Sequence, residues 1–234
     1  MADLVYPPVI LVLTSFWKYL GLKLDFKGVE NLPTRTKGGA ILAINHISYL
    51  DFALAGTAAL PMKRYVRFMA KKEIFDNKLA GPLMRGMHHI NVDRSNGSAS
   101  FVAALRALRD GEIIGIFPEG TISVSFEIKE LKTGVVRLAQ GADVPVIPTI
   151  IWGSQRIWTK KVKRDLRRKR VPISVTFGEP ISFPKGGDVE AGEALLRETM
   201  VKMLHGMQEK YPDSHEGQRW APVRLGGTAP APLN

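Results

Sequence analysis

Short apolar runs of strand length alternate with helical segments along most of this chain. Residues 40–44 are continuously apolar, as in a strand buried on both faces of a parallel sheet, and residues 112–117 and 144–152 have the same character. Residues 98–109 have the spacing of an amphipathic helix that ends at Gly111. This alternation predicts an α/β fold with a mostly parallel central sheet flanked by helices. The other predicted strands are residues 22–29, 65–69, 90–92 and 172–177, and the other predicted helices are 48–60, 80–87, 133–140 and 189–209.

The chain length suits one hydrophobic core. With 234 residues we expect a single α/β domain, which we place at residues 25–211. A membrane-associating helix is expected within residues 1–24, and the Pro- and Gly-rich tail 212–234 is expected to be poorly ordered. The sequence has no cysteine, which excludes a disulfide framework, a thiolate zinc site and a cysteine nucleophile.

The N-terminal segment combines two prolines with an apolar run and aromatic residues. Pro7 and Pro8 suit the first turn of a helix, and the run at residues 9–20 is shorter than the roughly 20 apolar residues that span a bilayer. No basic region precedes it and no small-residue cleavage site follows, so a signal peptide is not expected. We therefore predict an interfacial amphipathic helix with Trp17 and Tyr19 at the depth of the lipid headgroups. A helix packed in the core is the alternative.

The charge balance predicts anionic partners. There are 33 Lys and Arg residues against 22 Asp and Glu, and a dense basic run extends from Arg156 to Arg170 with Trp158 inside it. Near an anionic bilayer each Lys or Arg contributes about 1 kcal/mol, so anionic membrane lipids are expected partners. The phosphates of coenzyme A, or no ligand at all, are the alternatives for this run. No nucleic-acid recognition motif accompanies the run, so nucleic acid is not expected.

The first candidate for chemistry is the Asn-His-Ile-Ser-Tyr-Leu-Asp segment at residues 45–51. His46 directly follows a buried strand, where α/β proteins place their sites. If a helix begins at Ser48, the Asp51 carboxylate can reach back to one imidazole nitrogen of His46 and leave the other free to take a proton from a hydroxyl. The alternative is a capping box, in which Asp51 only accepts hydrogen bonds from backbone amides.

Three further segments accompany this one. Residues 117–121, Phe-Pro-Glu-Gly-Thr, follow another buried strand and present backbone amides and one carboxylate, which suits a polyol or phosphate, although an ordinary turn is the alternative. Arg94 follows strand 90–92 and could hold a phosphate through two hydrogen bonds, or form a surface salt bridge. Residues 144–148, Val-Pro-Val-Ile-Pro, begin a strand whose prolines belong at an edge or near its start.

In this order and at these spacings the four segments resemble the PlsC-type glycerolipid acyltransferases, the 1-acyl-glycerol-3-phosphate acyltransferase family. That family's pattern is Asn-His-x4-Asp, a strand ending in Asp-Arg, then Phe-Pro-Glu-Gly-Thr and a Val-Pro-Val-x-Pro strand. The likeness extends from Gly39 to Gly153 and includes residues 70–73 and 132–134.

The resemblance implies a reaction and a set of roles. His46, oriented by Asp51, would deprotonate the acceptor hydroxyl, which would attack the thioester of an acyl-CoA or acyl carrier protein. A long-chain acyl group would pass to 1-acyl-glycerol-3-phosphate (lysophosphatidic acid) and give phosphatidic acid, without a covalent acyl-enzyme, a metal or a cofactor other than acyl-CoA as co-substrate. The expected place is the cytoplasmic face of the cell membrane, as a peripheral or monotopic protein. The substrate-binding residues that the resemblance implies are Arg94, Glu119, Gly120, Thr121, Lys71 and Lys132.

The sequence departs from the family pattern at the acceptor site. Ile122 stands where the family usually has arginine, Lys78 where it often has proline, and His88 where it often has glycine. An isoleucine cannot replace a bidentate donor. Either the acceptor is another lipid, such as a lysophospholipid or a glycolipid hydroxyl, or the charge comes from Arg94 with Lys71, Lys72 or Lys132. A non-catalytic basic membrane-binding protein is the alternative from another class.

Overall fold

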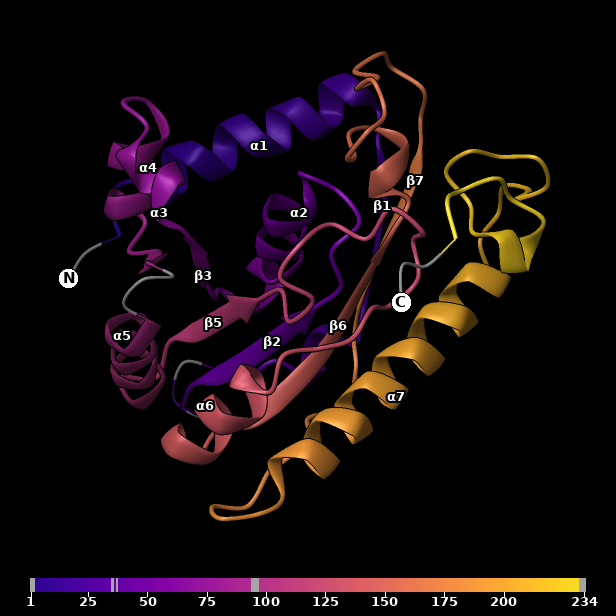
Figure 1. The fold of residues 1–234 in the computed structure, drawn as a ribbon. Coiled ribbons are helices and arrows are strands. Elements are labelled where there is room, and N and C mark those ends of the chain that lie inside the picture. The colour runs from indigo at the N-terminus through magenta and orange to yellow at the C-terminus, as the bar shows by residue number, and fades with distance from the viewer. Residues whose placement is uncertain (1–2, 35, 37, 94–96, 232–234) are drawn as a thin grey trace.

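The centre of the structure is a mostly parallel β-sheet (Figure 1). The computed structural model describes residues 3–34, 36, 38–93 and 97–231, and within them seven strands form one sheet of order β1-β7-β6-β2-β5-β3-β4. Neighbouring strands are parallel except β6 and β7. The expected α/β fold is therefore confirmed. The strands are β1 (Lys23–Lys27), β2 (Ala40–Ile44), β3 (Val66–Lys71), β4 (Ile90–Val92), β5 (Ile113–Ile116), β6 (Val146–Trp152) and β7 (Pro172–Phe177).

Helices cover both faces of the sheet, with α1 and α2 on one side and α5, α6 and α7 on the other (Figure 1). Side chains of β2 alternate between the two cores: Ile41 and Ala43 join the core under α5 to α7, whereas Leu42 and Ile44 join the core under α1 and α2. The sheet therefore separates two apolar layers. The helices are α1 (Tyr6–Leu20), α2 (Asp51–Ala58), α3 (Lys72–Asp76), α4 (Ala80–Gly86), α5 (Gly97–Arg109), α6 (Gly134–Ala142) and α7 (Val189–Glu209).

Most predicted elements are present, with differences at a few positions. Helix α2 begins at Asp51 rather than Ser48, and the five-residue helix α3 was not predicted. Strand β6 lies inside the sheet between β7 and β2, so it is not an edge strand. It tolerates Pro148 because its ladder with β7 begins only at Thr149, one residue beyond the missing N–H.

Helix α1 is anchored by one face and exposed on the other. The Trp17 indole N–H donates to Thr57 Oγ1 on α2 at 3.1 Å, and the Trp17 side chain is buried. The prediction that Trp17 lies at headgroup depth is therefore wrong, because the ring fills the core beneath the helix. Tyr19 remains 65% exposed, together with Leu11 and Val12. Among the described residues, none of the helices combines the length and the apolar character needed to cross a bilayer.

The C-terminal segment packs against the domain, so the prediction of a poorly ordered tail is wrong for residues 212–231. Trp220 lies edge-on to Trp152 of β6, with ring centroids 6.5 Å apart, and the Arg156 guanidinium lies 4.4 Å above the Trp220 ring. Arg156 also forms an ion pair with Asp213. Aromatic side chains bury enough area to order this segment despite its proline and glycine content.

Candidate active site

The loop after β2 leaves the sheet at Asn45. The Asn45 side chain donates to the Ile151 carbonyl at 3.0 Å and accepts the Ile151 N–H at 2.7 Å. This amide therefore continues the pairing with β6 after the backbone of β2 has turned away. Because Asn45 is buried and bonded on both sides, the next residue, His46, has a defined position at the carboxyl edge of the sheet.

His46 and Asp51 form a hydrogen-bonded pair. His46 Nδ1 lies 3.0 Å from Asp51 Oδ2, and the same oxygen accepts the backbone N–H groups of Ile47 and Ser48 at 2.8 Å each. The predicted contact between His46 and Asp51 is therefore present, and Asp51 accepts backbone N–H groups in addition. The Asp51 carboxylate is fully buried, whereas the His46 side chain is 21% exposed.

The other imidazole nitrogen lies in an aromatic environment. None of the described residues hydrogen-bonds His46 Nε2. The ring stacks on Phe117 with centroids 4.2 Å apart, which fixes its plane. Phe117 stacks in turn on Phe68, which meets the partly exposed ring of Phe52 edge-on, so an aromatic row leads from His46 to the surface of α2.

The loop after β5 holds the backbone of His46 on both sides. Glu119 Oε1 accepts the His46 N–H at 2.8 Å, and Ser123 donates its N–H to the His46 carbonyl at 2.7 Å. The other Glu119 oxygen accepts the Lys129 N–H at 3.2 Å. Burial raises the pKa of Glu119 to about 7, although the two amide donors favour the ionised form. The buried Glu119 carboxylate thus connects the loop that contains His46 to the segment that contains Lys129.

The next residues of this loop lie together with two lysines. Gly120 has a left-handed φ of +71°, and a Cβ there would meet the Lys132 side chain at 3.2 Å. Lys129 Nζ donates to the Thr121 carbonyl at 2.7 Å and to Thr121 Oγ1 at 2.6 Å. Burial lowers the pKa of the Lys129 ammonium. The structure therefore brings Gly120, Thr121 and Lys132 together and adds Lys129, which sequence reasoning missed.

The other predicted binding residues are Lys71 and Arg94. Lys71 is exposed at the carboxyl end of β3, which β5 separates from β2. Arg94 lies outside the described residues. The Ile122 side chain is buried, so the position where the resembled family has arginine is turned toward the core.

Sequence reasoning also missed the contacts that the segment after β6 makes with the His46 loop. Ser154 Oγ donates to Asp51 Oδ1 at 2.7 Å, and Thr159 Oγ1 donates to the Ile47 carbonyl at 2.6 Å. Ser48 Oγ donates to the Trp158 carbonyl, also at 2.6 Å. The available signal was topological, because β6 is adjacent to β2 and parallel to it, so the residues after both strands meet at one edge.

The described residues offer no set of ligands for a metal ion. In the part of the chain that the structure describes, no group of His, Asp or Glu residues is arranged to hold a metal ion. The expectation that the chemistry uses neither metal nor cofactor stays a prediction.

Comparisons with known proteins point to one family. A family model described as Acyltransferase matches residues 23–152. A 1-acyl-sn-glycerol-3-phosphate acyltransferase from Bacillus subtilis is 38% identical over 125 residues, covering 53% of this chain and 60% of the relative. A probable 1-acyl-sn-glycerol-3-phosphate acyltransferase from Mycoplasma pneumoniae is 32% identical over 198 residues, covering 76% of this chain and 71% of the relative.

A solved structure shares the fold. The crystal structure of the 1-acyl-sn-glycerophosphate acyltransferase PlsC from Thermotoga maritima matches with a TM-score of 0.65 and 23% identity, over 86% of this chain and 82% of that one. Of the curated relatives, those from Bacillus subtilis and Limnanthes alba are matched over only 60% and 57% of their own length.

Proposed function

This chain belongs to the Acyltransferase family, and on that premise we propose that it transfers a long-chain acyl group from a thioester to lysophosphatidic acid, giving phosphatidic acid. The observation that carries the proposal is the His46–Asp51 pair, whose free Nε2 lies on an aromatic surface. The names of the relatives support this acceptor.

Each residue of the pair has one task in the proposed reaction. His46 Nε2 takes the proton of the acceptor hydroxyl while the oxygen attacks the thioester carbonyl carbon. The tetrahedral intermediate collapses by breaking the C–S bond, and the imidazolium returns its proton to the departing thiolate. Asp51 keeps the proton on Nδ1 and stabilises the imidazolium. No acyl-enzyme forms, in keeping with the absence of cysteine.

Acceptor binding is assigned to the basic residues around the loop after β5. Lys132 lies against Gly120, and Lys129 donates to the hydroxyl of the next residue, Thr121. We place the glycerol phosphate here, with Lys71 and Arg94 completing the charge. Glu119 contributes by holding the His46 backbone, because backbone amides engage both of its oxygens. The acyl chain is assigned to the aromatic row that begins at Phe117.

Two neighbouring surfaces support a proposal for where in the cell the protein acts. The outer face of α1 is apolar, and a side chain at Gly21, where α1 ends, would meet Arg168 of the basic loop. Figure 1 shows this loop beside the C-terminal end of α1. An apolar helix beside exposed Lys and Arg side chains suits an anionic bilayer. We propose that the protein is peripheral or monotopic at the cytoplasmic face of the cell membrane, and that its donor is acyl-CoA or an acyl carrier protein.

A panel of acceptors tests the proposal. Purified protein, palmitoyl-CoA and palmitoyl-acyl carrier protein are assayed with lysophosphatidate, glycerol 3-phosphate and lysophosphatidylcholine, and both the released thiol and the lipid product are measured. The highest kcat/KM is expected with lysophosphatidate. The buried Ile122 favours a second candidate, in which another lysophospholipid or a glycolipid hydroxyl is the acceptor, and a preference for such a lipid would select it. Absence of transfer from both donors to every acceptor contradicts both candidates.

A further inference from the structure

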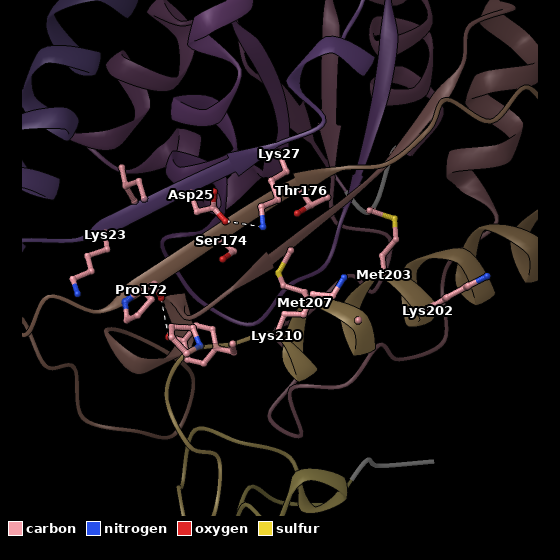
Figure 2. A pocket seen from close by; sticks show the side chains of 14 residues that line it. Lys23, Asp25, Lys27, Pro172, Ser174, Thr176, Lys202, Met203, Met207 and Lys210 are labelled. Atoms are coloured by element: carbon pink, nitrogen blue, oxygen red, sulfur yellow. Dashed lines mark hydrogen bonds and ion pairs between the residues drawn. The ribbon is translucent and has the colours of Figure 1, made fainter.

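A second site lies on the face of the sheet opposite α1. Strand β1, strand β7 and the C-terminal half of α7 enclose a groove of about 450 Å³ (Figure 2). Leu24 and Phe26 of β1 pack into the core beneath α1 and α2, so the alternate residues of this edge strand turn toward the groove. The groove therefore opens away from the proposed membrane surface.

Lysines line both walls of this groove. Lys23 and Lys27 project from β1, and Lys202 and Lys210 project from α7. Asp25 is the acidic residue among the lining side chains, and it pairs with Lys27 at 3.1 Å. The two lysines of each wall are about 12–13 Å apart along their elements. Positive charge therefore extends along the groove and is not focused at one point.

The floor contains two methionines and two hydroxyl side chains. Met203 and Met207 of α7 lie between the lysine rows, beside Ser174 and Thr176 of β7 (Figure 2). Methionine side chains adapt to irregular apolar surfaces. Methionines between charged walls suit an amphipathic partner whose charged residues flank an apolar stripe.

Gly206 gives an independent sign of a close approach. It lies inside α7 and lines the groove between Lys202 and Lys210. A glycine inside a helix costs about 1 kcal/mol relative to alanine. A Cβ at Gly206 would meet no atom within 4 Å, so packing within this chain does not require the glycine. A partner backbone lying along α7 at this point would account for it.

One end of the groove lies near buried residues that contact the catalytic pair. Tyr211 donates its hydroxyl to the Pro172 carbonyl at 2.8 Å at this end, and a Cβ on Gly153 would strike the same carbonyl. The next residue, Ser154, donates to Asp51. Gly153 and the buried Ser154 therefore separate this end of the groove from the catalytic pair.

We propose that this groove docks an acidic acyl carrier protein, which holds the acyl chain as a thioester on a flexible arm. The inference rests on the proposed function and assigns the donor of that reaction. The carrier would lie with an acidic helix between the lysine rows, and its arm would pass the Pro172 end toward His46. The lipid acceptor would enter from the opposite face, where α1 lies (Figure 1).

The lining favours a protein over the phosphates of coenzyme A. The phosphates of a nucleotide are compact, and arginine binds them through two hydrogen bonds. The groove instead has four lysines, which act as separate point charges, and two methionines, while arginine is absent from its described lining. Carboxylates spread along a helix match this arrangement better.

Charge neutralisation on both walls tests the proposal. Lys23→Gln and Lys27→Gln are combined with Lys202→Gln and Lys210→Gln, and Lys185→Gln in the loop before α7 is the matched control. The fourfold variant should raise KM for palmitoyl-acyl carrier protein about tenfold or more and flatten its dependence on salt. The control should change KM less than about twofold. If the fourfold variant changes KM equally for palmitoyl-CoA, or leaves both values unchanged, the proposal is overturned.

Filling the groove with a larger side chain at Gly206 tests the proposal independently of charge. Gly206→Leu should keep or raise the midpoint of thermal unfolding, because helix propensity increases and a Cβ at this position meets no atom within 4 Å. It should nevertheless raise KM for the carrier substrate, whereas Gly206→Ala should do so less. Unchanged carrier kinetics in a folded Gly206→Leu variant would exclude the docked helix.

Direct binding separates the failure of this inference from failure of the proposed function. Fluorescence anisotropy of labelled holo acyl carrier protein measures docking without turnover. If wild type binds the carrier and the fourfold variant does not, the groove is supported even when no acyl transfer occurs. If the fourfold variant binds the carrier normally but loses binding to phosphatidylglycerol vesicles, the groove is a lipid surface and the inference is wrong.

Discussion

Two histidines, His46 and His89, lie at opposite ends of one row of aromatic rings. His46 stacks on Phe117, Phe117 stacks on Phe68 at 6.3 Å, and Phe68 meets His89 edge-on at 5.6 Å. The two imidazoles therefore share an apolar setting. They differ in the partner of Nδ1, which is the Asp51 carboxylate for His46 and the backbone N–H of Phe68 for His89.

That difference in partner separates the proposed base from a structural acceptor. His89 directly precedes β4, and its ring accepts the Phe68 N–H at 3.0 Å on the side where β4 has not yet begun. Burial lowers the pKa of His89 to about 4, so the ring is neutral and its acceptor nitrogen is occupied. His46 has a carboxylate behind it and an open nitrogen in front. An aromatic environment alone therefore does not make a catalytic histidine.

The largest effect is expected when the His46 imidazole is removed. His46→Ala should lower kcat/KM for acyl transfer by about 10²–10⁴-fold, because no other group takes the proton from the hydroxyl. Vesicle binding and the free energy of unfolding should change little, because the side chain is partly exposed. Steady-state kinetics and a vesicle flotation assay measure both. Retained turnover would mean that the pair is not the base.

A smaller loss is expected when the negative charge of Asp51 is removed. In Asp51→Asn, the amide oxygen can still accept the N–H groups of Ile47, Ser48 and the imidazole, and the NH2 can face Ser154 Oγ. The ring then keeps its orientation, but the imidazolium loses its stabilising charge. The kcat should fall about 10–100-fold, because loss of the carboxylate costs less than loss of the base. Ser154→Ala is the matched control, because it removes one donor to Asp51 and leaves the carboxylate. An Asp51→Asn loss no larger than that of Ser154→Ala would contradict an electrostatic role of Asp51.

Local pattern was sufficient to predict much of the fold. The continuous apolar run of β2 and the periodicity of α7 each predicted an element with the observed bounds, because burial on both faces or on one stripe is visible in neighbouring residues. Trp17 could not be placed in the same way. An amphipathic helix shows that one face is buried, but the partner at Thr57 lies 40 residues away.

The contacts of the candidate site also divide into a local one, which the sequence predicted, and long-range ones, which it did not. His46 and Asp51 are five residues apart, so a turn and a helix start were enough to predict their contact. Ser154 bonds Asp51 across 103 residues, and Glu119 bonds the His46 amide across 73. These contacts depend on the sheet order and on which way each loop turns, which local spacing does not encode. The family pattern predicted Glu119 as a site residue, but its inward position came from the structure.

A stability effect is expected at the other end of the aromatic row. His89→Phe keeps an aromatic ring beside Phe68 but removes the acceptor, so the buried Phe68 N–H loses its partner. The free energy of unfolding should fall by about 1–3 kcal/mol, while kcat of the folded enzyme should change less than about twofold. Urea denaturation and kinetics measure the two. A large loss of kcat without loss of stability would place His89 in the reaction and end the contrast with His46.

The smallest effect concerns the pH dependence of stability. The pKa of His89 falls from 6.5 to about 4 on folding, so the unfolded chain binds more protons between these values, and the free energy of unfolding falls as pH falls through this window. The pKa of Glu119 rises from 4.5 to about 7, so its contribution to stability has the opposite sign and increases as pH falls.

In His89→Gln, the amide oxygen can still accept the Phe68 N–H, but the titrating group is gone. Relative to wild type, this variant should gain about 1–2 kcal/mol between pH 7 and pH 5. Parallel stability curves for the two proteins would mean that His89 is not held neutral by burial, and the distinction between the two histidines would then depend on Asp51 alone.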